Sequence, residues 1–220
     1  TDPQALEEKT NNYIVGLAAH GGQLGLAAAD VSTGDFRVTQ VPAAEAARLR
    51  DELHRLGARE IVVDAGWLRF EHLFPRLDQV LKAQVVKHRA EAFSRARAYR
   101  TLTGHFQMST LAAFGCEDQP AAIRAAGGLL DYLLETQKTG LQHLTALRTY
   151  TLDQYLLLDA ATRRNLELVQ RLADGAKKGS LLGVLDATVT AMGGRRLREW
   201  VERPLRKVAA INRRLDGVQE

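Results

Sequence analysis

Residues 12–41 read NYIVGLAAHGGQLGLAAADVSTGDFRVTQV, and this stretch decides the fold that we expect. It contains three apolar runs of strand length, at residues 12–19, 24–31 and 36–41. The segments between them, HGGQ and STGD, are rich in the glycine and small polar residues that are typical of hairpin turns. Because short turns join neighbouring strands in opposite directions, the stretch predicts an antiparallel meander.

After the meander, helical and strand patterns alternate. Leu49, Leu53 and Leu56 lie on one helical stripe, residues 60–64 suit a short buried strand, and residues 84–86 suit a fifth strand after a mixed segment. Three antiparallel strands followed by helix, strand, helix and strand is the order of a ribonuclease H-like sheet, whose later strands pair in parallel. The sequence therefore predicts an α/β ribonuclease H-like domain.

From Pro120 onward the apolar residues recur at helical spacing. Pro120 suits the first turn of a helix whose apolar face includes Ile123, Leu130 and Leu133, and which ends near residues 139–140. Gly127 and Gly128 inside this helix cost about 1 kcal/mol each in helix propensity. That cost is tolerable if another backbone approaches closely there.

Residues 155–169 read YLLLDAATRRNLELV and predict a short buried strand or extended segment, an N-cap at Asp159 and then a packed helix. The apolar stripe of that helix continues to Leu172. Ser180 and Thr190 are placed to cap two further helices, and the last helix has apolar residues at heptad-like steps: Val208, Ile211, Leu215 and Val218. The second half of the chain is therefore expected to be all-α apart from this short strand.

These patterns predict a linker at residues 1–11, an α/β domain at residues 12–110 and an all-α segment at residues 111–220. Basic residues interleave with aromatic ones over residues 87–110, which we interpret as a basic helix that links the two domains or as a binding surface. The chain begins with Thr1 rather than Met and ends in an apparently helical run, so we expect a piece of a longer protein.

Composition narrows the functional classes. A hydrophobic content of 45% is enough for a core, and no 18-residue apolar run predicts a membrane span. The one cysteine, Cys116, lies in an apolar context, which predicts a buried thiol and a reducing, cytoplasmic setting. Residues 195–214 hold eight Lys and Arg against two Glu, a charge of +6 that either attracts nucleic acid or forms the solvated face of amphipathic helices.

The residue types that catalysis requires are not found in a recognisable pattern. A nuclease with this fold needs several carboxylates converging on divalent metal ions, and the candidates Asp30, Asp35 and Asp64 lie at strand ends or turns, where Asp is common for backbone reasons. The string GAKKGS at residues 175–180 has its glycines one residue too close for a phosphate-binding P-loop. The six histidines show no metal-ligand spacing, so we expect no enzyme activity.

The amino-acid sequences of several segments resemble the MutS family of DNA mismatch-repair proteins. The strings are LDAATRRNLEL at residues 158–168, SLLGVLDATVTAMGGRRLREW at 180–200, RPL at 203–205, and the shorter DVSTGD at 30–35 and LETQK at 134–138. The resemblance implies that residues 12–110 are the connector domain and that residues 111–220 are the first part of the helical core or lever domain.

The resemblance also implies a parent protein that binds mismatched duplex DNA, ATP and Mg²⁺ through domains outside this chain and acts as a homodimer. This piece would couple the mismatch-binding and ATPase ends, with no cofactor of its own. The family's connector docks a MutL-type partner, and the matching positions are Arg97, Arg100 and Thr101, although some members carry glutamines there. An ordinary solvated helix is the alternative at these positions, and a nuclease or a non-specific DNA-binding module is the alternative for the whole chain.

Overall fold

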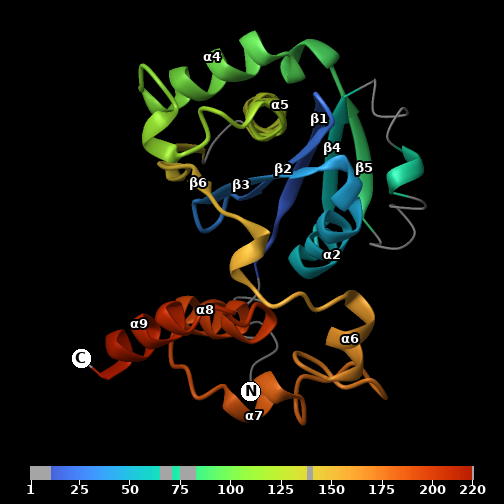
Figure 1. The fold of residues 1–220 in the computed structure, drawn as a ribbon, viewed down its shortest axis with the longest axis vertical. Helices are drawn as coiled ribbons and strands as arrows, with labels where there is room; N and C mark the ends of the chain where they lie inside the picture. The colour runs from blue at the N-terminus through green and yellow to red at the C-terminus, as the bar shows by residue number, and fades with distance from the viewer. Residues whose placement is uncertain (1–10, 65–70, 75–82, 138–140, 220) are drawn as a thin grey trace. The chain divides into compact units, whose positions relative to one another are not determined.

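The computed structural model describes residues 11–64, 71–74, 83–137 and 141–219 (Figure 1). The chain divides into two compact units, an α/β unit of residues 12–151 and a helical unit that begins at Leu152. The helix expected between the fourth and fifth strands falls mainly on residues 65–70 and 75–82, and the expected helix end at residues 139–140 and most of the 1–11 linker also lie outside the described residues.

The α/β unit is built on a six-stranded sheet with the order β5-β4-β1-β2-β3-β6. The strands are β1 (Ile14–His20), β2 (Gln23–Asp30), β3 (Asp35–Pro42), β4 (Glu60–Asp64), β5 (Gln84–His88) and β6 (Arg148–Thr149). Strands β1, β2 and β3 are antiparallel, whereas β4 pairs in parallel with β1, β5 with β4, and β6 with β3. The predicted meander and the parallel pairing of the later strands are confirmed, while β6 was not predicted.

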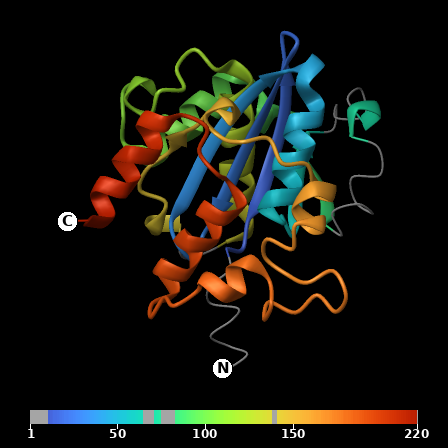
Figure 2. The same cartoon turned by 60° about the horizontal axis from the view of Figure 1, so that its bottom comes forward.

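Both faces of this sheet are covered by helices. Helix α2 (Ala46–Leu56) lies on one side, and α4 (Arg95–Phe106) and α5 (Pro120–Thr136) lie on the other, as Figure 2 shows. Successive strand residues point to opposite faces, so the central strands must be apolar throughout. In β1, for example, Val15 and Leu17 are fully buried on one face of the sheet. Ala18, on the other face, is also buried, between the sheet and α5.

Helix α5 lies unusually close to the sheet because both surfaces are made of small residues. A Cβ atom on Gly25 of β2 would lie 2.1 Å from the carbonyl oxygen of Ala121, and one on Gly16 of β1 would lie 2.6 Å from that of Ala125. The N-terminus of α5 is held by β3, since Gln40 Oε1 accepts from the backbone N–H of Ala121 at 3.0 Å. Strand glycines of this kind mark a close backbone approach.

The opposite face of α5 receives α4 and the 3₁₀ turn before it. A Cβ atom on Gly127 would lie 2.3 Å from the Cα of Ala98, and one on Gly128 would lie 2.4 Å from the ring of Phe93. The close backbone approach that makes a helix glycine tolerable is thus present at Gly127. Helix α5 is held between the sheet and α4, with backbone contact on both sides.

The observed boundary between the units differs from the one expected after residue 110. Helix α5 covers the sheet and belongs to the α/β unit, which continues to Thr151. The basic segment 87–110 does not link two domains, because its helix α4 packs on α5 within the same unit. Periodicity identifies the apolar face of a helix but not the surface that this face covers, which is why the boundary was misplaced.

Short 3₁₀ turns connect these elements. They are η1 (Ala43–Glu45), η3 (Glu71–Leu73), η4 (Ala90–Phe93), η5 (Ala112–Phe114), η6 (Leu141–His143) and, in the helical unit, η7 (Leu152–Gln154). No helix within the described ranges is both long and apolar enough to cross a membrane.

The helical unit contains α6 (Ala160–Asn165), α7 (Leu181–Leu185), α8 (Ala191–Glu202) and α9 (Val208–Gln219). Three predicted N-caps are confirmed: Asp159 accepts from the N–H of Thr162 at 2.6 Å, Ser180 from that of Gly183 at 3.1 Å, and Thr190 from that of Gly193 at 3.0 Å. Each cap satisfies one of the free N–H groups of a first helical turn.

Of the two alternatives for residues 155–158, a buried strand or an extended segment, the buried strand is wrong. Tyr155 makes an isolated antiparallel bridge with Leu205, and the side chains of Leu156 and Leu157 are 50% and 56% exposed. The helix that follows is also shorter than predicted, because it ends at Asn165 and leaves the leucines that should have extended its stripe more than half exposed: Leu166 and Leu172. Glu167, with a φ of +47°, turns the chain at this point.

Candidate interaction site

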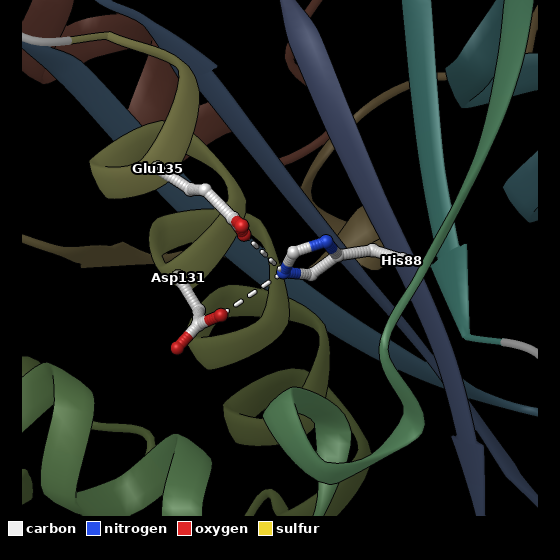
Figure 3. Close-up of side chains that lie close together, drawn as sticks. All are labelled: His88, Asp131 and Glu135. Carbon is white, nitrogen blue, oxygen red and sulfur yellow. Dashed lines mark hydrogen bonds and ion pairs between the residues drawn. The ribbon is translucent and has the colours of Figure 1, made fainter.

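A connected group of charged side chains lies where β5 ends beside α5 (Figure 3). His88 is the last residue of β5 and Arg89 follows it, while Asp131 and Glu135 lie one turn apart on α5. Arg97 reaches the same place from α4. We call these five residues the Asp131 network.

Asp131 is the centre of this network and is only 4% exposed. Its Oδ2 atom accepts from His88 Nε2 at 2.9 Å and from Arg89 Nε at 2.9 Å and Nη2 at 2.5 Å, and its Oδ1 atom accepts from Arg97 Nη2 at 3.3 Å. Burial by itself would raise the pKa of the Asp131 carboxyl, but the hydrogen bonds from these three donors outweigh it and lower that pKa. The network therefore holds a buried negative charge between three donors.

Two neighbours complete the surroundings of Asp131. Glu135 is mostly exposed and lies 3.8 Å from His88 Nε2 and 3.6 Å from Arg89 Nη2. Tyr132 contacts the ring of His88 edge-on, with 5.5 Å between ring centroids, and donates its hydroxyl proton to Glu60 at 2.5 Å. Burial and the Glu60 carboxylate raise the pKa of Tyr132 to about 12.

His88, Asp131 and Glu135 are residue types that bind divalent metal ions, and in the described part of the chain they form the one group whose ligand atoms lie within 4.8 Å of one another. The spacing search along the sequence missed them because they are far apart in the chain. However, Arg89 and Arg97 already donate to Asp131, and two guanidinium charges oppose a further cation at that carboxylate. The arrangement therefore fits an ion-pair network better than a metal centre.

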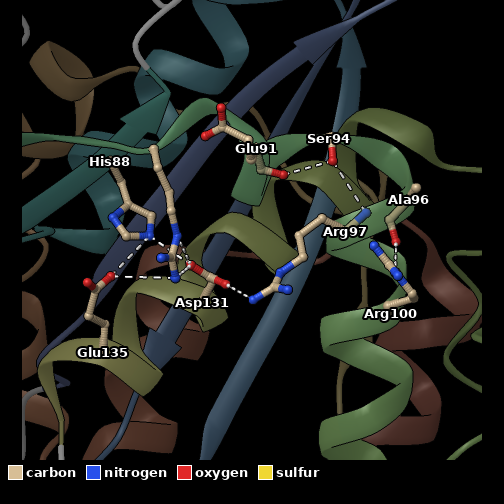
Figure 4. A network of polar contacts seen from close by, with 9 residues as sticks. His88, Glu91, Ser94, Ala96, Arg97, Arg100, Asp131 and Glu135 are labelled. Carbon is tan, nitrogen blue, oxygen red and sulfur yellow. Dashed lines mark hydrogen bonds and ion pairs between the residues drawn. The ribbon is translucent and has the colours of Figure 1, made fainter.

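The residues expected to dock a partner lie on α4, and Figure 4 shows two of them, Arg97 and Arg100, beside this network. Arg97, Arg100 and Thr101 lie along one side of the helix, because they are three and four residues apart. Arg97 and Arg100 are exposed and Thr101 is half-buried. Arg97 is tied to Asp131, whereas Arg100 donates from Nε to the carbonyl oxygen of Ala96 at 3.3 Å. Docking at these residues stays a prediction, but two of the three present guanidinium groups to solvent.

The nuclease alternative does not find the convergent carboxylates that it needs. Fully buried Asp30 accepts from the N–H of Asn12 and from both the N–H and the hydroxyl of Ser32, so it serves a turn. The strand register places Asp30 and Asp64 beside opposite ends of β1, about five residues or 16 Å apart along that strand. Asp35 accepts from the hydroxyl of Tyr13 at 2.7 Å. Asp30 and Asp35 therefore have structural partners, and Asp64 lies far from Asp30 along the sheet.

The other sequence candidates also have structural roles. In the P-loop-like string, Lys177 forms an ion pair with Asp186 and Ser180 caps α7. In the basic stretch 195–214, the guanidinium groups of Arg196 and Arg214 lie 5.9 and 4.4 Å from the ring centroid of Trp200, which joins α8 to α9. Cys116 is fully buried, as predicted, and burial raises the pKa of its thiol.

Sequence reasoning did not identify Asp131, although a signal for it exists. The segment Leu129-Leu130-Asp131-Tyr132-Leu133 places one carboxylate within the buried part of α5. A charge among buried apolar positions requires a partner of opposite charge, and the adjacent His88-Arg89 pair is such a partner. Only the fold shows that these segments meet.

Comparison with known proteins gives two matching family models, MutS domain II over residues 12–145 and MutS domain III over residues 161–220. The DNA mismatch repair protein MutS of Symbiobacterium thermophilum is 43% identical over 223 residues, and that of Desulfosudis oleivorans is 44% identical over 225, each covering all of this chain and 25% of the relative. The protein of the same name from Trichormus variabilis is 43% identical, covering 98% of this chain and 26% of the relative. The chain thus spans about a quarter of the length of these relatives.

Proposed function

This chain belongs to the MutS family of DNA mismatch-repair proteins, and on that premise we propose that it couples the mismatch-binding and ATPase ends of a longer protein. The observation that supports this proposal is the match of its two compact units to two successive domains of the family. In this proposal ATP and Mg²⁺ act in other parts of the parent protein, and the present chain hydrolyses no nucleotide.

A coupling element must be rigid enough to pass a displacement from one end to the other. The α/β unit has this property at its exit, because the N–H of Tyr150 donates to the carbonyl oxygen of Val38 at 3.0 Å and its hydroxyl donates to Glu52 at 2.8 Å. Glu52 is buried and also accepts two hydrogen bonds from Arg55. A force applied at Leu152, the next unit's first residue, would thus reach both β3 and α2.

We also propose that the α/β unit docks a MutL-type partner through α4, at Arg97, Arg100 and Thr101. The support is that α4 is fixed in place by the backbone contact between Ala98 and Gly127, while Arg97 and Arg100 on its other side face solvent. A firmly held helix loses little conformational entropy when a partner binds.

Three further parts of the proposal concern the parent protein and its fold class. A ribonuclease H-like classification of the α/β unit is supported by its central strand order, β5-β4-β1-β2-β3, with the first three strands antiparallel. A homodimeric parent rests on the family resemblance. A cytoplasmic location rests on the same resemblance and on the single, buried cysteine.

The coupling proposal is tested in the longer protein that contains this chain, by its mismatch-stimulated ATP hydrolysis. Tyr150→Phe removes the hydroxyl bond to Glu52 at the junction and is expected to lower the stimulation while leaving the unstimulated rate unchanged. Tyr99→Phe is the matched control, because it removes a hydroxyl bond to Glu117 in the same unit but away from the junction. Equal stimulation in the two variants and the unmodified protein would refute coupling through this junction.

A further inference from the structure

Helix α4 has a charge pattern that opposes its own stability. Its N-cap, Ser94, accepts from the N–H of Arg97 at 3.3 Å, and the first turn contains Arg95 and Arg97 but no acidic residue. Arg100 follows, and no Asp or Glu occurs anywhere in α4. The N-terminus of a helix carries a partial positive charge and favours acids there by about 0.3–1 kcal/mol each, so these arginines cost stability. Natural proteins break local rules of this kind mainly at functional sites.

One of these arginines is held by a buried carboxylate. Arg97 is 52% exposed, yet its Nη2 atom donates to Asp131 Oδ1, while His88 and Arg89 use the other oxygen of that carboxylate (Figure 4). Nη2 of the Arg97 guanidinium is thus held by the carboxylate, while about half of the side chain stays exposed to solvent. An arginine side chain has about 2 kcal/mol of rotamer entropy, and holding it before binding reduces the part that the partner must supply.

We propose that the arginine face of α4, formed by Arg95, Arg97 and Arg100, binds acidic side chains of the MutL-type partner, and that Asp131 is a positioning residue for Arg97. This inference rests on the proposed docking at α4. It adds the chemistry of the partner surface and assigns a role to Asp131, which does not itself contact the partner. A guanidinium and a carboxylate form parallel hydrogen bonds, so the orientation of Arg97 affects affinity as well as its charge.

Charge distribution favours an acidic protein over duplex DNA as the occupant. The α/β unit has 16 Lys and Arg against 14 Asp and Glu, a net charge of only +2, so it has no large excess of positive charge for a polyanion. Binding to the phosphate backbone draws on many distributed cations, whereas a few arginines on one helix face suit a local protein contact.

The experiment measures the affinity of this chain for a MutL-type protein from the same source by isothermal titration calorimetry at 50 and 200 mM salt. Arg97→Ala and Arg100→Ala are each expected to raise Kd 5- to 20-fold, and the higher salt should weaken binding by the unmodified chain. Asp131→Asn is expected to raise Kd 3- to 10-fold in the unmodified chain and less than 2-fold in the Arg97→Ala background. Glu135→Gln removes the same charge one turn along α5, does not contact Arg97, and should change Kd less than 2-fold.

The outcomes separate the two proposals. Unchanged affinity in both arginine variants would overturn docking at α4. Weaker binding in the arginine variants together with an equal effect of Asp131→Asn in both backgrounds would leave the docking in place and refute the positioning role. If Asp131→Asn lowers the melting temperature too far for titration, Arg97→Lys replaces it: affinity equal to the unmodified chain refutes positioning, and a loss as large as in Arg97→Ala supports it. If duplex DNA competes with the partner protein and the competition depends on the same arginines, the ligand of this helix face is phosphate and not an acidic side chain.

Discussion

The close contact between α4 and α5 predicts opposite effects for two glycine substitutions. Gly127→Ala in α5 places a methyl group 2.3 Å from the Cα and Cβ atoms of Ala98, where carbon atoms normally lie about 3.5–4.0 Å apart. Gly104→Ala in α4 places one where no atom lies within 4 Å. Both changes add the same group to the interior of a helix, so helix propensity alone predicts the same gain for each.

The magnitude follows from two terms. Alanine is favoured over glycine in a helix by about 1 kcal/mol, and overpacking a close contact costs about 1–3 kcal/mol. Because the atoms next to Gly127 belong to the backbone of α4, no side-chain rotation relieves the clash and the upper figure applies. We expect Gly127→Ala to destabilise the α4–α5 contact by about 2 kcal/mol and Gly104→Ala to stabilise α4 by about 1 kcal/mol.

Hydrogen–deuterium exchange with mass spectrometry measures both effects on peptides from α4 and α5, without requiring the two units to unfold together. A difference of 2 kcal/mol is about a 30-fold faster exchange of these amides in Gly127→Ala, and 1 kcal/mol is about a 5-fold slower exchange of α4 in Gly104→Ala. Equal protection of α4 and α5 in the two variants would refute the reasoning, because it would mean that backbone proximity does not restrict Gly127.

Three further predictions concern single groups. Thr190→Ala removes the cap on α8 and is expected to cost about 1 kcal/mol, measured as about 5-fold faster exchange of the α8 amides; an unchanged rate would contradict the capping role. The pKa of Asp131 is lower in the folded chain than in the unfolded one, so its contribution to the free energy of unfolding is present above pH 4 and is lost as the pH falls through the folded pKa. Urea unfolding midpoints measured between pH 2 and 7 should show this loss in the unmodified chain. The Asp131→Asn variant should not show it. Ultraviolet absorbance should show one tyrosine that ionises near pH 12 and disappears in Tyr132→Phe, whereas ionisation of every tyrosine near pH 10 would argue against the Glu60 contact.

Local chemistry was enough to predict much of the α/β unit. The turns after β1 and β2 contain Gly21, Gly22 and Gly34, each with positive φ. Glycines next to small polar residues predict a turn without reference to the rest of the fold. The helix N-caps at Asp159, Ser180 and Thr190 are local in the same way, since each side chain bonds a backbone N–H three residues ahead.

Predictions failed where the answer depended on distant residues. The run Tyr155–Leu158 is apolar enough for a buried strand, but its distant main-chain partners are only Leu205 and Pro204 within the described residues. The side chains of Leu156 and Leu157 remain half exposed. Helix α5 reads equally well as part of a helical domain, because its apolar pattern does not reveal that glycines on β1 and β2 provide the matching surface.

The sequence by itself determined the family, the strand meander and the caps, because the motifs, turns and capping side chains that indicate them are local in the chain. Only the tertiary structure decided that α5 belongs to the sheet and that Asp131 meets His88, Arg89 and Arg97. Those donors lie 43, 42 and 34 residues from it along the chain. The need of a buried carboxylate for partners is visible in the sequence, but the identity of the partners depends on which surfaces pack together.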